Sequence, residues 1–208
     1  MFTLQTFQYL SIGALLGLTA GISPGPLLSL MLMETLRHNL KAGIKIAFAP
    51  LITDLPVILI SLAIFSRLSA FHTVLGLISL AGGIFIAYMG YETFRTKSLT
   101  PDPETNPSSL RIGIITNFLS PHPYLFWATI GAPLALKAAE TNTLSVILFF
   151  LSFYLLLVGS KVGVALIAAR SKTFLNNQSY LRLMQVLGIS LFLFSLYFLY
   201  DGMKMILE

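Results

Sequence analysis

Long apolar stretches separated by short polar ones run along the whole chain, and six of them are long enough to cross a membrane. A helix that spans the hydrocarbon core needs about 20 apolar residues. No stretch alternates polar and apolar residues as a barrel strand would. The sequence therefore predicts an all-α integral membrane protein, with spans roughly over residues 5–33, 45–65, 74–94, 112–136, 144–169 and 183–207.

A polar, proline-rich segment over residues 95–110 divides these spans into two sets of three. Clusters of this composition are typical of loops and linkers. We take it as a cytoplasmic linker between a first repeat, residues 1–94, and a second repeat, residues 111–208. Because each set has an odd number of spans, the second set enters the membrane from the opposite side. The prediction is a 3+3 inverted repeat, an arrangement common among secondary transporters.

The first and fourth spans each contain a Ser-Pro-x-Pro motif. The motifs are Ser23, Pro24, Gly25 and Pro26 in the first span, and Ser120, Pro121, His122 and Pro123 in the fourth. Proline lacks a backbone N–H and clashes with the preceding turn, so both helices should be broken there. In lipid the freed backbone groups must face protein or a water-filled cavity. Two such breaks at corresponding places point to a transport site at mid-membrane; the alternative is two kinks that only shape the bundle.

Each break should expose the N-terminus of a half-helix, whose unpaired N–H groups can hold an anion such as a carboxylate. The hydroxyls of Ser23 and Ser120 could cap these half-helices or contact the substrate. Asn117 could cap freed backbone groups at the second break. His122 could shuttle a proton, because an imidazole titrates near neutral pH; the alternative is a neutral, hydrogen-bonded ring.

Asp54 is the only acidic residue well inside a predicted span, and Lys161 is the only basic one. A charge at the bilayer centre costs about 2.5–3.5 kcal/mol on insertion scales, so such residues face the bundle interior and are usually functional. Asp54 could bind a substrate ammonium or carry a proton. Lys161 could bind a carboxylate or act as the counter-ion of Asp54. The alternative is a permanent salt bridge that fixes packing, although desolvation makes buried pairs weak stabilisers.

These arguments together give ten predicted substrate-binding residues, of which Asp54 and His122 are also predicted to couple transport to protons. The ten are Ser23, Pro24, Gly25, Pro26, Asp54, Asn117, Ser120, Pro121, His122 and Lys161. Tyr124 and Trp127 could line the same cavity, but aromatic residues in membrane helices are more often packing residues or interface anchors.

Glycines mark the predicted helix contacts. Gly13, Gly17 and Gly21 lie four residues apart on one face of the first span, and Gly159 and Gly163 do so on the fifth. Small residues at this spacing let another helix approach closely. Helix packing is therefore the role expected for Gly13, Gly17 and Gly21.

Composition changes the picture only by excluding functions. Of the 208 residues, 56% are hydrophobic and 10% are charged, whereas a soluble domain has about 25% charged residues. The net charge of +5 comes from basic residues at span ends, so no nucleic-acid partner is expected. The chain has no cysteine, which excludes thiolate metal sites. Without a catalytic arrangement, metal-ligand spacing or phosphate loop, we expect no enzyme activity, cofactor or resident metal.

The basic residues also predict the orientation. Nine of them flank the first, third and fifth connections, and three flank the opposite side. By the positive-inside rule these three connections are cytoplasmic and both termini lie outside. The first connection is expected to be a short polar loop that contains Glu34, Arg37, His38 and Lys41.

Four motifs follow one another along the chain: Gly21-Ile22-Ser23-Pro24-Gly25-Pro26; Leu36-Arg37 with Lys41-Ala42-Gly43; Tyr88-Met89-Gly90 with Phe94-Arg95; and Asn117 with Pro121 before Leu125-Phe126. In this order they resemble the LysE/RhtB family of amino-acid exporters. The resemblance covers the whole chain and carries the family's motif positions onto Pro24, Gly25, Pro26, Asn117 and Pro121. It implies an inner-membrane secondary exporter that is driven by the proton gradient.

The chain also departs from that family's pattern. Leu27 follows the Pro-Gly-Pro sequence where the family commonly has Asn, the second motif is stretched, and Asp54 is not part of the commonest pattern. The resemblance therefore predicts a divergent member. Its substrate is expected to be an amino acid or a similar small zwitterion or cation.

Two other functions remain as alternatives. A metal-cation exporter would need several oxygen or imidazole ligands, and one buried carboxylate with one nearby histidine makes a poor set. A function as a membrane scaffold or accessory subunit would not explain the two breaks or the two buried charges. A homo-oligomer is compatible with each of these functions.

Overall fold

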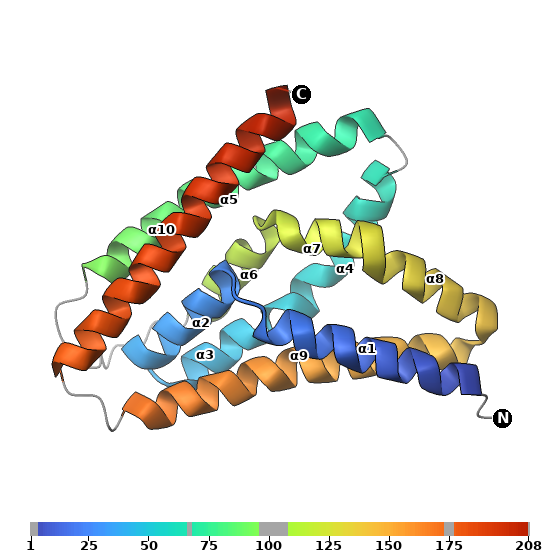
Figure 1. Ribbon diagram of the computed structural model, residues 1–208, viewed down its shortest axis with the longest axis horizontal. Coiled ribbons are helices and arrows are strands. Elements are labelled where there is room, and N and C mark those ends of the chain that lie inside the picture. Colours follow the sequence, from blue (N-terminus) through green and yellow to red (C-terminus); the bar gives the residue numbers. More distant parts are fainter. Residues whose placement is uncertain (1–3, 66–67, 96–107, 173–176, 208) are drawn as a thin grey trace.

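The computed structural model describes residues 4–65, 68–95, 108–172 and 177–207, and within these ranges the chain is helical apart from short turns (Figure 1). Its helices are α1 (Leu4–Ile22), α2 (Pro26–Arg37), α3 (Leu40–Ala47), α4 (Ala49–Phe65), α5 (Leu68–Phe94), α6 (Ser109–Phe118), α7 (Pro121–Phe126), the π-helix η1 (Trp127–Gly131), α8 (Ala132–Thr141), α9 (Thr143–Lys172) and α10 (Asn177–Leu207). Most of the predicted linker lies outside the described residues.

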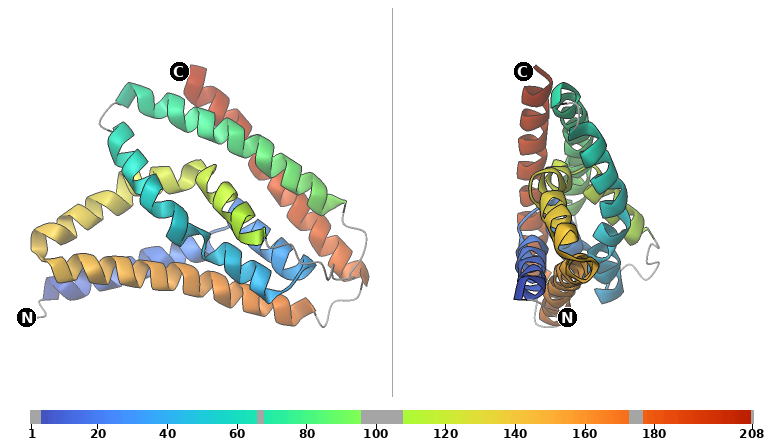
Figure 2. Two further views of the ribbon diagram at one scale, coloured as in Figure 1. Left: turned by 180° about the vertical axis from the view of Figure 1, so that it is seen from behind. Right: turned by 90° about the vertical axis from the view of Figure 1, so that its right-hand side faces the viewer.

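Helices α1 and α9 lie side by side along one edge of the molecule (Figures 1 and 2). A Cβ added to Gly13 or Gly17 would collide with the backbone carbonyl of Phe149 or Phe153. Only a residue without a side chain permits so close an approach. The contact residues advance in the same direction on both helices, so α1 and α9 run parallel. The predicted packing role of this glycine face is confirmed.

Helices α5 and α10 form a second close pair, which is antiparallel. Gly76 contacts Gly202 near one end of the pair, and Gly90 contacts Gly188 near the other. In Figure 1 this pair diverges from the α1–α9 pair, with α4, α6 and α7 between them. The shorter helices therefore lie between two pairs of long helices.

The glycine face predicted on α9 is different. Apart from the adjoining backbone of α9 itself, no atom lies within 4 Å of a Cβ built on Gly159 or Gly163. The close helix contact that this spacing allows is therefore not made there in the part of the chain that the structure describes. The reason is that α1 lies against a different face of α9, the one that carries Phe149 and Phe153.

Both proline motifs break helices as predicted. The break between α1 and α2 bends the chain by 61°. The break between α6 and α7 also turns the chain sharply, as Figure 2 shows. Pro26 and Pro121 each begin the following helix. A proline is tolerated at this position because the N–H that it lacks would have no partner in the helix.

Four helical segments are long and apolar enough to cross a membrane, and the bent pair α1–α2 makes a fifth candidate. The four are Leu40–Ile60, Thr73–Tyr91, Thr143–Ser171 and Gln178–Leu207. The predicted fourth span, over residues 112–136, is not among them, because it is divided between α6, α7, η1 and α8. The all-helical membrane class is therefore supported, and the six-span arrangement stays a prediction.

The polar loop predicted after the first break is mostly helix. Helix α2 continues to Arg37 and α3 begins at Leu40. The Asn39 side chain caps α3 by accepting a hydrogen bond of 3.1 Å from the backbone N–H of Ala42, and this cap explains why the new helix starts at once. Glu34, which was placed in that loop, is instead a buried residue of α2.

Candidate functional site

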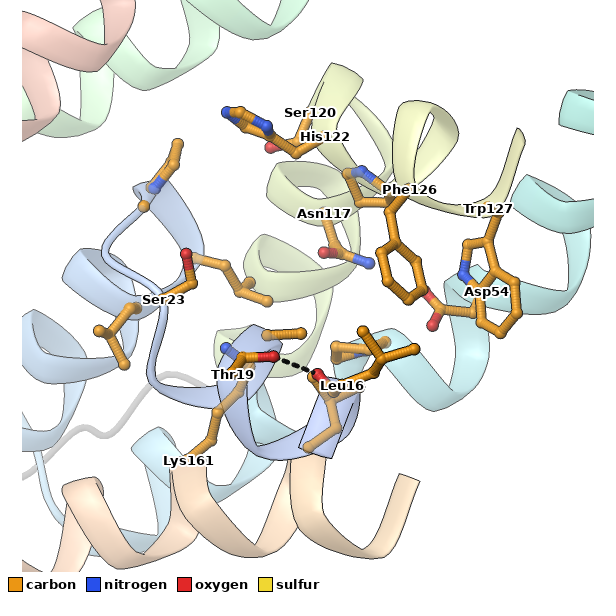
Figure 3. A pocket seen from close by; sticks show the side chains of 18 of the residues that line it. Leu16, Thr19, Ser23, Asp54, Asn117, Ser120, His122, Phe126, Trp127 and Lys161 are labelled. Carbon is orange, nitrogen blue, oxygen red and sulfur yellow. Dashed lines mark hydrogen bonds between the residues drawn. The ribbon is translucent and has the colours of Figure 1, made fainter. Parts of the chain in front are cut away.

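A cavity of about 430 Å³ lies where α1, α2, α4, α6, α7 and α9 meet (Figure 3). Both proline breaks face this cavity, although they are about a hundred residues apart in the sequence. Nine of the ten predicted binding residues line its wall: Ser23, Pro24, Gly25, Pro26, Asp54, Asn117, Ser120, His122 and Lys161. The tenth, Pro121, is buried at the start of α7. The structure thus gathers these residues, and their binding of a substrate stays a prediction.

At the first break, the N-terminus of α2 faces the cavity. Gly25 precedes the helix in an extended conformation, with φ −176°, and no side chain caps it. Its carbonyl accepts the first helical bond, from Ser29 N–H at 3.0 Å. The N–H groups of Leu27 and Leu28 therefore have no partner within the helix, and both residues line the cavity. Ser23 does not cap the helix, contrary to one of the two roles considered for it.

The second break is stabilised by side chains that bond to nearby carbonyls. Ser120 donates to the Thr116 carbonyl at 2.9 Å, so its hydroxyl does not cap α7. The Tyr124 hydroxyl donates to the Phe118 carbonyl at 2.9 Å. These bonds satisfy carbonyls that the interrupted helix leaves without partners. The sharp turn is thus stabilised locally.

Asn117 acts across helices rather than within its own break. Its side-chain amide donates to the Thr53 hydroxyl at 2.5 Å, which ties α6 to α4. The amide also lies within hydrogen-bonding reach of Asp54, the next residue along α4. The prediction that Asn117 caps the break is therefore replaced by a role in positioning α4.

Asp54 lies on α4 and is buried, with 4% of its surface exposed. The side chains of Trp127, Tyr154 and Asn117 lie within hydrogen-bonding reach of its carboxylate. These three donors come from η1, α9 and α6, so three elements converge on one carboxyl group. Buried charge in a membrane helix is costly unless it is solvated by such groups. The carboxylate is therefore held at one end of the cavity instead of facing lipid (Figure 3).

Trp127 is fixed more tightly than a lipid-facing anchor would be. It is 1% exposed and stacks on Phe150, with ring centroids 5.8 Å apart. It also packs edge-on against Phe153. A Cβ on Gly131 would collide with the indole ring, so this position of the ring depends on the glycine. Trp127 opens a π-helical turn, and such turns often occur at functional sites. The sequence favours a packing or anchoring role for Trp127 and does not predict that its side chain reaches the Asp54 carboxylate.

Lys161 contacts the end of α1 and not Asp54. Its ammonium donates to the Gly21 carbonyl at 3.1 Å, and its side chain is buried. The last carbonyls of a helix have no partners in that helix, and a cation is favoured there. No salt bridge joins Lys161 to Asp54 within the described part of the chain. The permanent pair considered above is therefore not formed in this conformation.

His122, at the start of α7, is one of the residues that line the cavity, at its edge (Figure 3). One side of its ring lies near Phe198 of α10, with ring centroids 6.0 Å apart. This position leaves part of the imidazole exposed. A proton-carrying role is compatible with such exposure and stays a prediction.

A second buried carboxylate was overlooked because Glu34 was placed in a loop. Glu34 is 3% exposed and accepts a hydrogen bond from the Ser109 hydroxyl at 2.7 Å. The His38 imidazole lies 3.6 Å from its other oxygen. The Ser109 contact joins α2 to the first turn of α6. The spacing of Glu34 and His38, one helical turn apart, was the available signal that the helix continues.

The cavity thus combines a carboxylate, an ammonium, an imidazole and a helix N-terminus in a largely apolar wall. Such a set can bind both ends of a small zwitterion and can exchange protons. No group of three or more His, Cys, Asp or Glu residues suited to a metal ion occurs in the described ranges.

Comparison with known proteins supports the resemblance drawn from the motifs. Residues 18–202 match the family model of the LysE type translocator. This range includes both breaks and all the charged residues of the cavity. No curated protein and no solved structure matches the chain. Members of the matched family are transporters and not enzymes. With its apolar helices, the chain is a multi-pass membrane transporter that belongs to the LysE type translocator family.

Proposed function

We propose that this protein exports an amino acid or a similar small zwitterion or cation from the cytoplasm in exchange for protons. The observation that supports this most is the position of Asp54, a buried carboxylate on the wall of a cavity onto which both broken helices open. Ionisable residues that face a cavity inside a membrane protein commonly mark a substrate or proton pathway.

Asp54 is the proposed site of competition between substrate and proton. Its carboxylate attracts an ammonium group when ionised and loses that attraction when protonated. The side chains of Trp127, Tyr154 and Asn117 lie within hydrogen-bonding reach of this carboxylate, so they can solvate its charge when no substrate amine is bound. A substrate amine would bind from the cytoplasmic side and be released when the outer, more acidic side protonates Asp54. His122 is the proposed second proton carrier on the same wall.

The substrate carboxylate is proposed to bind at the start of α2. The free N–H groups of Leu27 and Leu28 and the positive end of the helix dipole favour an anion there. Ser23 and Ser120 line the cavity nearby and offer hydroxyl donors. The ammonium of Lys161 has three protons, and the bond to Gly21 uses one of them. Its remaining donors and its charge add to the attraction.

We also retain the 3+3 inverted repeat over residues 1–94 and 111–208 as part of this proposal. The two broken helices would be the first member of each repeat, and α5 and α10 would be the third. Their antiparallel contact supports this, because an inverted repeat relates its third and sixth helices by a two-fold axis in the membrane plane. The bias of basic residues supports cytoplasmic first, third and fifth connections, with both termini outside the inner membrane.

The test is efflux from proteoliposomes that hold purified protein and a mixture of labelled amino acids. An acidic external medium should accelerate efflux relative to equal pH on both sides. Asp54→Asn should abolish this acceleration while the protein still inserts, and Asp54→Glu, which keeps a carboxylate, should retain part of it. Full proton-driven efflux by Asp54→Asn would contradict the mechanism. Wild-type vesicles that release no amino acid at any pH would contradict the function itself.

A further inference from the structure

The charges on the cavity wall limit the net charge of what can bind. Among the described residues that line it, Asp54 supplies one carboxylate and Lys161 supplies one ammonium. His122 is the third titratable side chain. A zwitterion has one ammonium and one carboxylate, so it matches one acidic and one basic side chain. A substrate with a third charge would find no further side chain of fixed opposite charge on this wall, and an unpaired charge is costly in an apolar surrounding.

The rest of the wall is apolar, and its apolar part lies next to Asp54. Figure 3 shows Leu16, Phe126 and Trp127 on the same side of the cavity as Asp54, while Ser23 and Lys161 lie on the opposite side. Phe153 and Leu157 of α9 add to this apolar wall. A zwitterion bound with its ammonium at Asp54 would therefore place its side chain against aromatic and aliphatic groups.

The aromatic part of this wall is rigid. Phe126 stacks on Phe153 with ring centroids 5.4 Å apart and an angle of 14° between the planes. Phe126 also packs edge-on against Trp127, at 5.3 Å. Interlocked rings cannot easily turn aside to admit water to a charged side chain. The wall therefore presents a fixed apolar surface.

The size of the cavity suits one small molecule. Ligand cavities range over about 300–1,000 Å³, and about 430 Å³ is near the lower end. This leaves room for one amino acid with a bulky side chain.

We propose that the substrate is a neutral amino acid with an apolar side chain of the size of leucine or phenylalanine, and that lysine, arginine and glutamate are excluded. This proposal rests on the exporter function proposed above and specifies its substrate class. It follows from the pairing of charges at Asp54 and Lys161 together with the apolar wall formed by Leu16, Phe126 and Phe153.

The first test measures thermal stabilisation of the purified full-length protein by leucine, phenylalanine, lysine and glutamate. Leucine and phenylalanine should raise the melting temperature at concentrations at least tenfold below any effect of lysine or glutamate. Stronger stabilisation by lysine or glutamate would overturn the substrate class and leave the exporter function standing. Stabilisation by no amino acid, with no efflux from the proteoliposomes, would overturn both proposals.

The second test changes the charge of the wall. Leu16→Asp adds a carboxylate to the apolar end of the cavity, and Leu16→Asn adds a polar group of similar size without charge. Only Leu16→Asp should gain lysine binding, by at least tenfold over wild type, while both variants should lose leucine binding. Equal lysine binding by the two variants would contradict the charge argument. If either variant fails to fold, the thermal stabilisation of the wild-type protein by the four amino acids decides whether the proposed substrate class holds.

Discussion

The ammonium of Lys161 donates a hydrogen bond to the Gly21 carbonyl at 3.1 Å, across 140 positions of sequence. Gly21 is in the last turn of α1, directly before the first break. The lysine therefore caps the helix end that the break exposes, and it does so from the neighbouring helix α9. The same side chain lines the cavity, so the cap and the candidate site share one charge.

Removal of this cap should destabilise the protein. Lys161→Met removes the donor and leaves the Gly21 carbonyl without its partner, which we expect to cost about 1–3 kcal/mol. Lys161→Arg keeps a charged donor and should stay within about 1 kcal/mol of wild type. Thermal unfolding in detergent measures both. Equal melting temperatures for Lys161→Met and wild type would show that the cap contributes nothing.

Replacement of Gly25 by alanine should leave the fold intact but slow transport. Its extended backbone suits any residue, and no atom lies within 4 Å of an added Cβ. Because Gly25 lines the cavity, the methyl group of Gly25→Ala would narrow it. We expect an unchanged melting temperature and a slower efflux rate. An unchanged efflux rate would mean that the substrate does not pass this point.

Gly17→Ala is the matched control for that variant. The same methyl group would collide with the Phe153 carbonyl in the α1–α9 contact. Overpacking of this kind costs about 1–3 kcal/mol, so this variant should lower the melting temperature. If both alanine variants melt alike, the close contact between α1 and α9 is not present in the membrane.

Trp127 should position Asp54 rather than only fill space. Trp127→Phe keeps a ring in the aromatic cluster but removes the N–H that reaches the carboxylate. We expect a several-fold increase in KM for efflux with little change in melting temperature. Trp127→Ala, which empties the site, should lower both affinity and stability. A Phe variant with wild-type kinetics would leave Trp127 as a packing residue.

The contact between Glu34 and Ser109 should contribute measurably to stability. A hydrogen bond to a charged group contributes about 1.5–3 kcal/mol, and this one is buried. Ser109→Ala should therefore destabilise the protein, because it leaves the carboxylate without its hydroxyl donor. A double-mutant cycle with Glu34→Gln isolates the coupling. A coupling energy near zero would show that α2 and α6 are held together by other contacts.

The predicted orientation is tested by a tag at the C-terminus. The excess of basic residues around the first, third and fifth connections places this end outside. An antibody should therefore reach the tag on spheroplasts with an intact inner membrane. Reaction only after lysis would reverse the orientation and, with it, the direction assigned to transport.

Much of the fold was predictable because the relevant rules are local. An apolar stretch of sufficient length predicts a helix in lipid, and proline breaks a helix wherever it occurs. The breaks at Pro26 and Pro121 and the packing face at Gly13 and Gly17 followed from such rules. Glu34 was misplaced because a charged residue near a chain break resembles a loop, whereas a hydrogen bond from the distant Ser109 lets it be buried.

The sequence alone thus determined the helical membrane class, the family and the two broken helices, since composition, motifs and proline chemistry act over a few residues. The tertiary structure decided which residues share the cavity. It brought Trp127 to Asp54, moved Lys161 to the end of α1, and left Gly159 without a neighbour. These outcomes depend on which faces of distant helices meet, and that is settled by packing across the whole chain.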